Sequence, residues 1–251
     1  MNLFVESKEA EIKLLYKLYR PVKDGLKPIA DMYKSFLVKQ GQACVEKCET
    51  QQDGKVLAIK DILINSNLIE NFLHMLKKQN KVIRECFLQD TVFVRQLQLA
   101  FQVFINLDVG KHTMAEMLST YIDKLLRKGG TSDNIDELIE HVVTLFSHLI
   151  DKDLFLEVYR NQLARRLLSE KCEDIENEKR LITNLKITCG LQQVNKIQGM
   201  ITDLTTAKDV SNAYNDYKLQ NPKVNGLDFT CQVLTTANWP SYKLMKVSIP
   251  I

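Results

Sequence analysis

The sequence contains few of the residue patterns that hold metals. Its 251 residues include no C-x-x-C pair and only four histidines, so the ligand spacing of a structural zinc site is missing. Cys44 and Cys48 lie four residues apart in a helical pattern, but no second pair completes a ligand set. We therefore expect free thiols in a reducing compartment, and neither a metal nor a cofactor.

Motifs of the common enzyme classes are missing as well. There is no G-x-S-x-G, no H-E-x-x-H and no phosphate-cradling glycine loop. Asp151 and Asp153 form a carboxylate pair, but they lie at the expected start of a helix, where acidic side chains interact favourably with the helix dipole. The sequence therefore predicts a protein that is not an enzyme.

Neither a strong charge excess nor a long apolar run is present. The 34 basic and 31 acidic residues leave a net charge of +3, whereas a nucleic-acid binder usually has a marked basic excess. No apolar stretch reaches the roughly 18 residues that span a bilayer, and the first residues do not have the pattern of a signal peptide. We expect a protein of the cytoplasm, the nucleus or both, which binds neither nucleic acid nor membranes.

Glycine and proline are scarce, and most segments between them have the apolar spacing of helices. Gly41 is a candidate break in the second of the expected helices. These helices cover residues 3–19, 22–50, 56–80, 91–106, 113–127, 134–150, 154–168, 174–189, 193–203 and 207–220.

After Asn221-Pro222 the apolar spacing changes from helical to alternating. Residues 229–234 and 244–249 each alternate like a strand, and the break at 238–241 would join them as a hairpin. In the first strand, Phe229, Cys231 and Val233 would face a core. Because a lone hairpin is marginal in water, this end needs a partner strand or a packing surface.

The helix expected over 154–168 is amphipathic. Its apolar face carries Leu156, Tyr159, Leu163, Ala164 and Leu167. Arg160 lies close to this face and should be paired or reach past the core. For Arg165 and Arg166 we favour a solvated face over a docking site.

Three blocks of residues follow one another in a fixed order. The first runs from Asp151-Lys152-Asp153 through Phe155 and Tyr159 to Leu163-Ala-Arg-Arg-Leu167. The others comprise Leu185-Lys186, Cys189-Gly190, Lys196, Met200 and Asp203, and then Leu227-Asp228-Phe229, Val233-Leu234 and Trp239-Pro240. Together with Gly41-Gln-Ala-Cys-Val-Glu-Lys47 upstream, they resemble the cullin family over nearly the whole chain.

The aromatic residues usual in cullins are replaced around Leu191, Gln193 and Val194 and at Ile201, so the chain resembles a divergent or truncated cullin or a cullin-like protein. The resemblance implies a mainly α fold: the last cullin-type helical repeat over 1–112, a four-helix bundle over 113–225, and the start of an α/β subdomain over 226–251. Full cullins also have an adaptor-binding first repeat and a segment whose lysine accepts a ubiquitin-like modifier. We expect neither within these 251 residues.

As a cullin, the chain would be a non-catalytic scaffold of a ubiquitin ligase. The resemblance implies that a RING-box protein adds a strand to the sheet edge, through β-augmentation. The residues assigned to this contact are Phe229, Thr230, Cys231, Gln232, Val233 and Leu234, and the family-motif core comprises Tyr159, Leu163, Leu167 and Trp239. The alternative for the strand is pairing within its own chain.

The resemblance also implies a basic patch that attracts a second partner. Lys124, Arg127 and Lys128 match the basic end of the bundle's first helix in cullins, which attracts the acidic tail of a ubiquitin-conjugating enzyme. The alternative is a solvated face without a partner. For the whole chain, the competing interpretation is a HEAT-like helical adaptor in trafficking or signalling, and the alternating residues at 228–249 argue against it.

Overall fold

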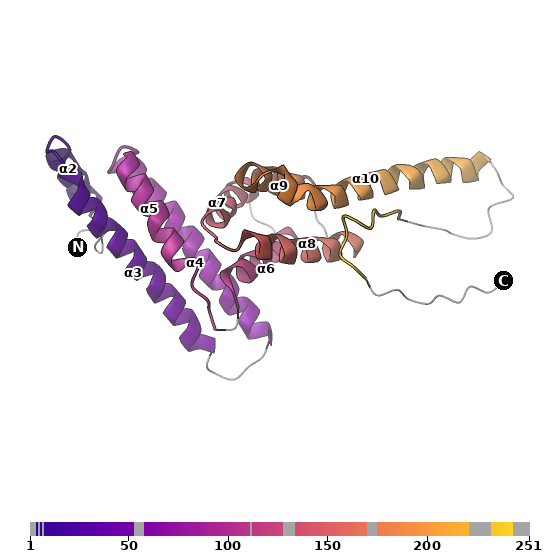
Figure 1. Ribbon diagram of the computed structural model, residues 1–251, viewed down its shortest axis with the longest axis horizontal. Coiled ribbons are helices and arrows are strands. Elements are labelled where there is room, and N and C mark those ends of the chain that lie inside the picture. The colour runs from indigo at the N-terminus through magenta and orange to yellow at the C-terminus, as the bar shows by residue number, and fades with distance from the viewer. Residues whose placement is uncertain are drawn as a thin grey trace. The chain divides into compact units, whose positions relative to one another are not determined.

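The computed structural model describes residues 4, 6, 8–52, 58–110, 112–127, 134–169, 175–220 and 232–242, without the side chains of 49–52 and 58–66. This part of the chain is mainly helical, as expected, and has no strand (Figure 1). The helices are α2 (Glu9–Tyr19), α3 (Leu26–Gln52), α4 (Ala58–Glu85), α5 (Thr91–Phe104), α6 (Met114–Leu126), α7 (Ile135–Ser147), α8 (Lys152–Leu168), α9 (Ile175–Cys189) and α10 (Leu191–Gln220).

The described helices belong to two compact units. The first contains α2 to α5, α6 as far as Leu125, α7, and α8 as far as Phe155. The second begins at Leu126, continues from Leu156 through the rest of α8, and includes α9, α10 and residues 232–242. The predicted domain limits at 112 and 225, and the predicted four-helix bundle, stay predictions.

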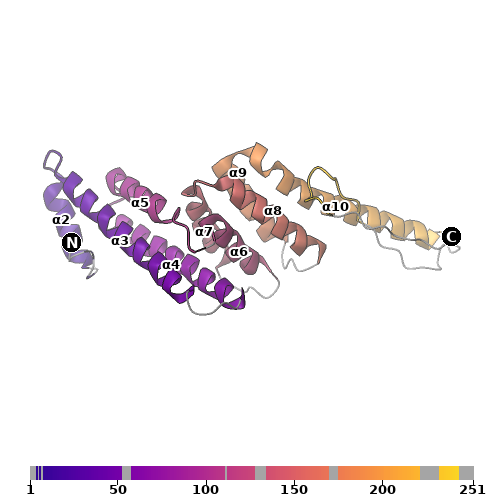
Figure 2. The same ribbon diagram turned by 60° about the horizontal axis from the view of Figure 1, so that its bottom comes forward.

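In the first unit, α3, α4 and α5 lie side by side (Figures 1 and 2). One end of their core is an aromatic cluster in which Phe87 and Phe93 stack with centroids 3.7 Å apart. Tyr16 of α2 and Tyr33 of α3 pack edge-on against both rings. Asp90 caps α5 by accepting a hydrogen bond from the Val92 amide, and it also accepts one from the Tyr16 hydroxyl. The cluster therefore ties α2 to the turn between α4 and α5.

Gly41 does not break α3, which continues unbroken to Gln52. A Cβ atom at this position would lie 2.2 Å from the buried ring of Phe104, so the glycine allows α3 and α5 to approach closely. The candidate break predicted from the sequence was therefore wrong. A glycine in a helix signals either a weak point or a close approach, and here it is the second.

In the second unit, α9 and α10 form a helical hairpin through Gly190, whose φ of 91° favours glycine. The two helices predicted over 193–203 and 207–220 are one continuous helix, α10. Its buried residues are Val194, Ile197, Met200, Ile201 and Ala207. The residues between the two predicted helices, Leu204 to Thr206, are compatible with a helix, so nothing ends α10 there.

The predicted hairpin falls mostly outside the described residues. Residues 232–242, which include the end of the first expected strand, contain no strand, and Val233 is 67% exposed. The expectation that Val233 faces a core is therefore wrong. Residues 229–231 and 244–249 lie outside the described part of the chain, and the hairpin itself stays a prediction.

Candidate functional site

The apolar face of α8 is confirmed. Tyr159, Leu163 and Ala164 are fully buried, and Leu156 and Leu167 are nearly so. Arg165 is exposed, as predicted, and Arg160 is half-buried. Two of the three helical members of the predicted motif core, Tyr159 and Leu163, have no accessible surface, so their first role is packing.

Arg166 corrects the prediction of a solvated side chain, because it is only 1% exposed. Its Nε and Nη2 atoms both donate hydrogen bonds to Oε1 of Glu178 on α9, at 2.9 and 2.7 Å. The Tyr159 hydroxyl donates to the other carboxylate oxygen at 2.5 Å, and the Glu178 side chain is completely buried. These three residues, which we call the Arg166–Glu178 cluster, join α8 to α9 through charge-assisted hydrogen bonds.

A second polar cluster holds residues 235–239 against α10. Asp203 of α10 accepts hydrogen bonds from the Thr235 amide at 2.9 Å, from the Thr235 hydroxyl at 2.9 Å and from Trp239 Nε1 at 2.8 Å. Asn238 Nδ2 is a weaker donor, at 3.5 Å. We call this set the Asp203 anchor. It places Trp239, which was predicted in the motif core and is 6% exposed, against α10.

Gly199 makes room for the anchor. It lies four residues before Asp203 on the same helix, and a Cβ atom there would lie 2.4 Å from Nδ2 of Asn238. A larger residue would displace the side chain of Asn238, the weakest donor of the anchor. Gly199 and Asp203 lie one helical turn apart and both face the Asn238 side chain.

Partial burial alone would raise the pKa of Asp203, but hydrogen bonds from Thr235, Trp239 and Asn238 outweigh it. The pKa of this carboxyl is therefore below its usual range. Thr235, Asn238 and Trp239 all donate hydrogen bonds to Asp203, so they favour the charged form of its carboxyl. The anchor is fully formed at neutral pH.

The predicted partner strand ends where the anchor begins. Gln232 and Val233 are exposed and Leu234 is half-buried, and the next residue is Thr235. Phe229, Thr230 and Cys231 lie outside the described residues. Thr235 and Asn238 were missed by sequence reasoning, because their contacts with Asp203 join positions more than 30 residues apart.

Of the predicted basic patch, Lys124 is exposed in the last turn of α6, and Arg127 is exposed just after that helix. Lys128 lies outside the described residues. In the second unit, Arg127 shares a recess of about 420 Å³ with Arg165, Arg166, Leu168, Ser169 and Tyr242. Among the described residues that line this recess there is no acidic side chain.

The described residues contain no group of three or more histidine, cysteine or acidic side chains that could hold a metal ion. Cys44, Cys48, Cys86 and Cys189 are free thiols. Burial raises the pKa of Cys44 and Cys86, so both are protonated at neutral pH and are weak nucleophiles. Throughout the part of the chain that the structure describes, each helix is too short or too polar to cross a membrane.

Comparison with known proteins decides the family. A family model described as the cullin alpha solenoid domain matches residues 1–211. The chain belongs to the cullin family. It is 34% identical to Cullin-1 of Oryza sativa subsp. japonica over 255 residues and 33% identical to Cullin-2 of Arabidopsis thaliana over 256 residues. Each alignment covers 99% of this chain and 34% of the relative.

Cullin-3A of Arabidopsis thaliana is 30% identical to this cullin chain, with 100% of the chain and 32% of the relative covered. The chain thus spans about a third of the length of the curated cullins it matches. Its Asp203 and Trp239 lie in the motif blocks that suggested the family, and in the structure these two residues contact each other. In this cullin, two separate sequence blocks therefore form one structural feature.

Proposed function

We propose that this chain is a non-catalytic scaffold segment of a cullin-RING ubiquitin ligase, and that a RING-box protein binds it through residues 229–234. The family membership supports the scaffold role. The Asp203 anchor supports the binding site, because it holds Thr235 in place directly after residues 229–234. A partner that adds a strand gains most from a segment whose end is held in place, because less conformational entropy is lost on binding.

The binding would proceed by β-augmentation. Backbone amides and carbonyls of 229–234 would pair with an extended segment of the RING-box protein, and alternate side chains would set the register. Gln232 and Val233 have exposed positions before the anchor, so their backbone is close to the surface. An exposed valine that gains a partner also buries apolar area, which would favour the complex.

The test is co-purification of the full chain with a RING-box protein. Val233→Pro should abolish the complex, because proline removes an amide donor and opposes continuation of a strand. Val233→Thr is the matched control, since threonine keeps the β-branched shape and the amide, and it should bind like the parent chain. A parent chain that does not retain the RING-box protein contradicts the partner assignment, and equal binding by the proline variant contradicts the strand.

We further propose that Lys124, Arg127 and Lys128 attract the acidic tail of a ubiquitin-conjugating enzyme. The exposure of Lys124 and Arg127, and the recess in which Arg127 lies beside Arg165, support this role. Charges of this kind act mainly on the association rate, and salt screens them over about 10 Å at 0.1 M.

Reversing two of these charges tests the patch. In a complex with the RING-box protein, Arg127→Glu with Lys128→Glu should slow recruitment of the conjugating enzyme about tenfold at low salt, and much less at high salt. Lys17→Glu with Lys39→Glu changes the net charge equally at exposed positions in the first unit, and should have a small effect. Unchanged recruitment by the Arg127/Lys128 variant at low salt would rule the patch out.

A further inference from the structure

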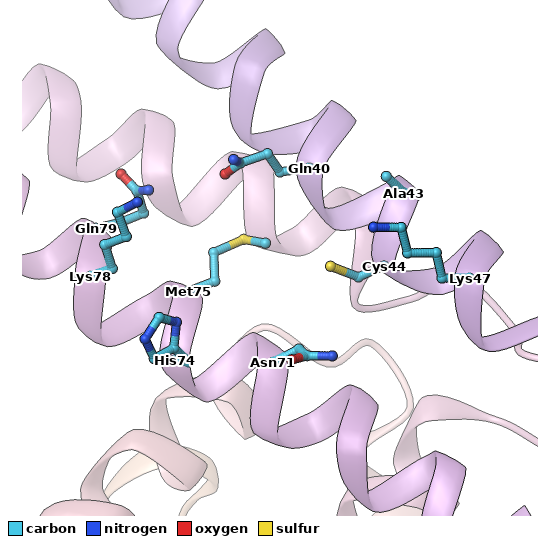
Figure 3. A pocket seen from close by; sticks show the side chains of 9 residues that line it. All are labelled: Gln40, Ala43, Cys44, Lys47, Asn71, His74, Met75, Lys78 and Gln79. Atoms are coloured by element: carbon cyan, nitrogen blue, oxygen red, sulfur yellow. The ribbon is translucent and has the colours of Figure 1, made fainter. Parts of the chain in front are cut away.

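A groove lies between α3 and α4 in the first unit (Figure 3). It has a volume of about 430 Å³. Each helix lines it with residues that repeat every three to four positions and so share one face. The lining residues are Gln40, Ala43, Cys44 and Lys47 of α3, and Asn71, His74, Met75, Lys78 and Gln79 of α4.

The floor of the groove is uncharged. Met75 is 9% exposed, and its thioether and the Cys44 thiol both point into the groove from opposite helices (Figure 3). Burial raises the pKa of Cys44 while Lys47 lowers it, and the net shift is upward, so the thiol is neutral. Gln79 is buried, and its Oε1 atom accepts a hydrogen bond from Tyr33, which holds the amide in place. This floor suits a small apolar side chain.

The rim of the groove is basic. Lys47 of α3 and Lys78 of α4 are exposed and lie at opposite ends of the groove, and His74 is exposed between them (Figure 3). The described residues that line the groove include no acidic side chain. Both lysines also make other contacts in the chain, but an ammonium group has three donors and can bind a further acceptor.

We propose that this groove binds an amphipathic α-helix that carries two acidic residues seven positions apart, with a small apolar residue midway between them. The lining residues run from Gln40 to Lys47 on α3 and from Asn71 to Gln79 on α4, which are seven and eight steps, or about 10–12 Å at a rise of 1.5 Å per residue. In the guest helix, positions i and i+7 span the same length, so its two carboxylates would reach Lys47 and Lys78. The residue at i+3 or i+4 would then rest on Met75 and Cys44.

Charge and length together favour a helix over a small anion. A small carboxylate could reach one lysine but not both ends of the groove. Two exposed helix stripes with an apolar floor match the helix-in-groove mode of recognition, in which apolar anchors recur at helical spacing. The guest would become a third helix beside α3 and α4. This site lies in the first unit and is independent of the RING-box proposal.

The test uses the full chain and a synthetic alanine-based helical peptide of about 18 residues, long enough to be helical in water. The acidic peptide has Glu at positions i and i+7 and Met at i+4. The basic peptide has the same sequence with Lys in place of both Glu residues. Fluorescence anisotropy should show that the acidic peptide binds better than the basic one. The double replacement Lys47→Glu with Lys78→Glu should weaken binding of the acidic peptide by about tenfold or more. The same variant should bind the basic peptide better than the parent chain does.

Lys17→Glu with Lys39→Glu is the matched control, because it changes the net charge equally at exposed positions outside the groove. It should leave the preference for the acidic peptide unchanged, and circular dichroism should show equal helix content for all variants. An equal loss in the control, or no preference for the acidic peptide in the parent chain, overturns the proposal. It is also overturned if sedimentation shows a dimer that the Lys47/Lys78 variant loses, since the groove would then bind a second copy.

Discussion

Replacing Arg166 by methionine should lower the free energy of unfolding by about 3–5 kcal/mol, because it removes a positive charge that is hydrogen-bonded to a buried carboxylate. Glu178 is completely buried, and Arg166 supplies two of the hydrogen bonds to it. The remaining donor identified at this carboxylate, the Tyr159 hydroxyl, cannot neutralise the charge. Urea unfolding followed by circular dichroism at pH 7 measures the loss.

Two variants separate the buried charge from the loss of side-chain volume. Arg165→Met makes the same replacement at the exposed neighbouring position, and it should change stability by about 0.5 kcal/mol or less. Arg166→Met with Glu178→Gln removes both charges and leaves an acceptor for Tyr159, so it should recover most of the loss. Equal effects of the Arg165 and Arg166 replacements would show that the cluster does not stabilise the second unit.

The apolar spacing of α8 predicted correctly which apolar residues are buried, but the burial of Arg166 was missed. Leu156, Tyr159 and Leu163 follow from apolar spacing alone, and all are buried. Arg166 lies seven residues after Tyr159, on that same face, but its charge suggested solvent. A signal for the buried pair was present in the sequence of α9. Glu178 is an acidic residue on the same helical face as Leu181, Ile182 and Leu185, which are buried, and its charge is opposite to that of Arg166.

Gly41 and the end of the chain show two other limits of sequence reasoning. The sequence cannot tell whether a glycine in a helix breaks it or allows another helix to approach, because that depends on Phe104, more than 60 residues away. Similarly, alternation at 229–234 predicted a strand from local spacing. The structure instead places Val233 in solvent, and the nearest ordering contact, at Thr235, comes from a distant carboxylate. Two of the motif blocks meet in such a long-range contact, the hydrogen bond from Trp239 to Asp203.

Asp203→Ala should release Trp239 from α10. The alanine removes the acceptor of the Trp239 indole N–H and of both Thr235 donors. Hydrogen bonds to a charged group contribute about 1.5–3 kcal/mol each, so losing them shifts the docking equilibrium of residues 235–239 by a factor of ten or more. Trp239 is the single tryptophan of the chain, so its fluorescence reports this site directly, and its emission should shift to longer wavelength.

The charge of the anchor is tested by a graded variant and by pH. Asp203→Asn keeps one oxygen for Trp239, and its amide can donate to the Thr235 hydroxyl, so the shift of the Trp239 emission should be smaller.

The pH dependence follows from the lowered pKa of Asp203 in the folded chain. The contribution of this carboxylate to docking of residues 235–239 is present above the unfolded pKa of about 3.9 and is lost as the pH falls through the folded value. Acid should therefore red-shift the parent emission below about pH 4, with a smaller change in Asp203→Asn. Asp209→Asn, an exposed position on the same helix, should behave like the parent chain. A Trp239 emission that Asp203→Ala leaves unchanged would show that the carboxylate does not hold this segment.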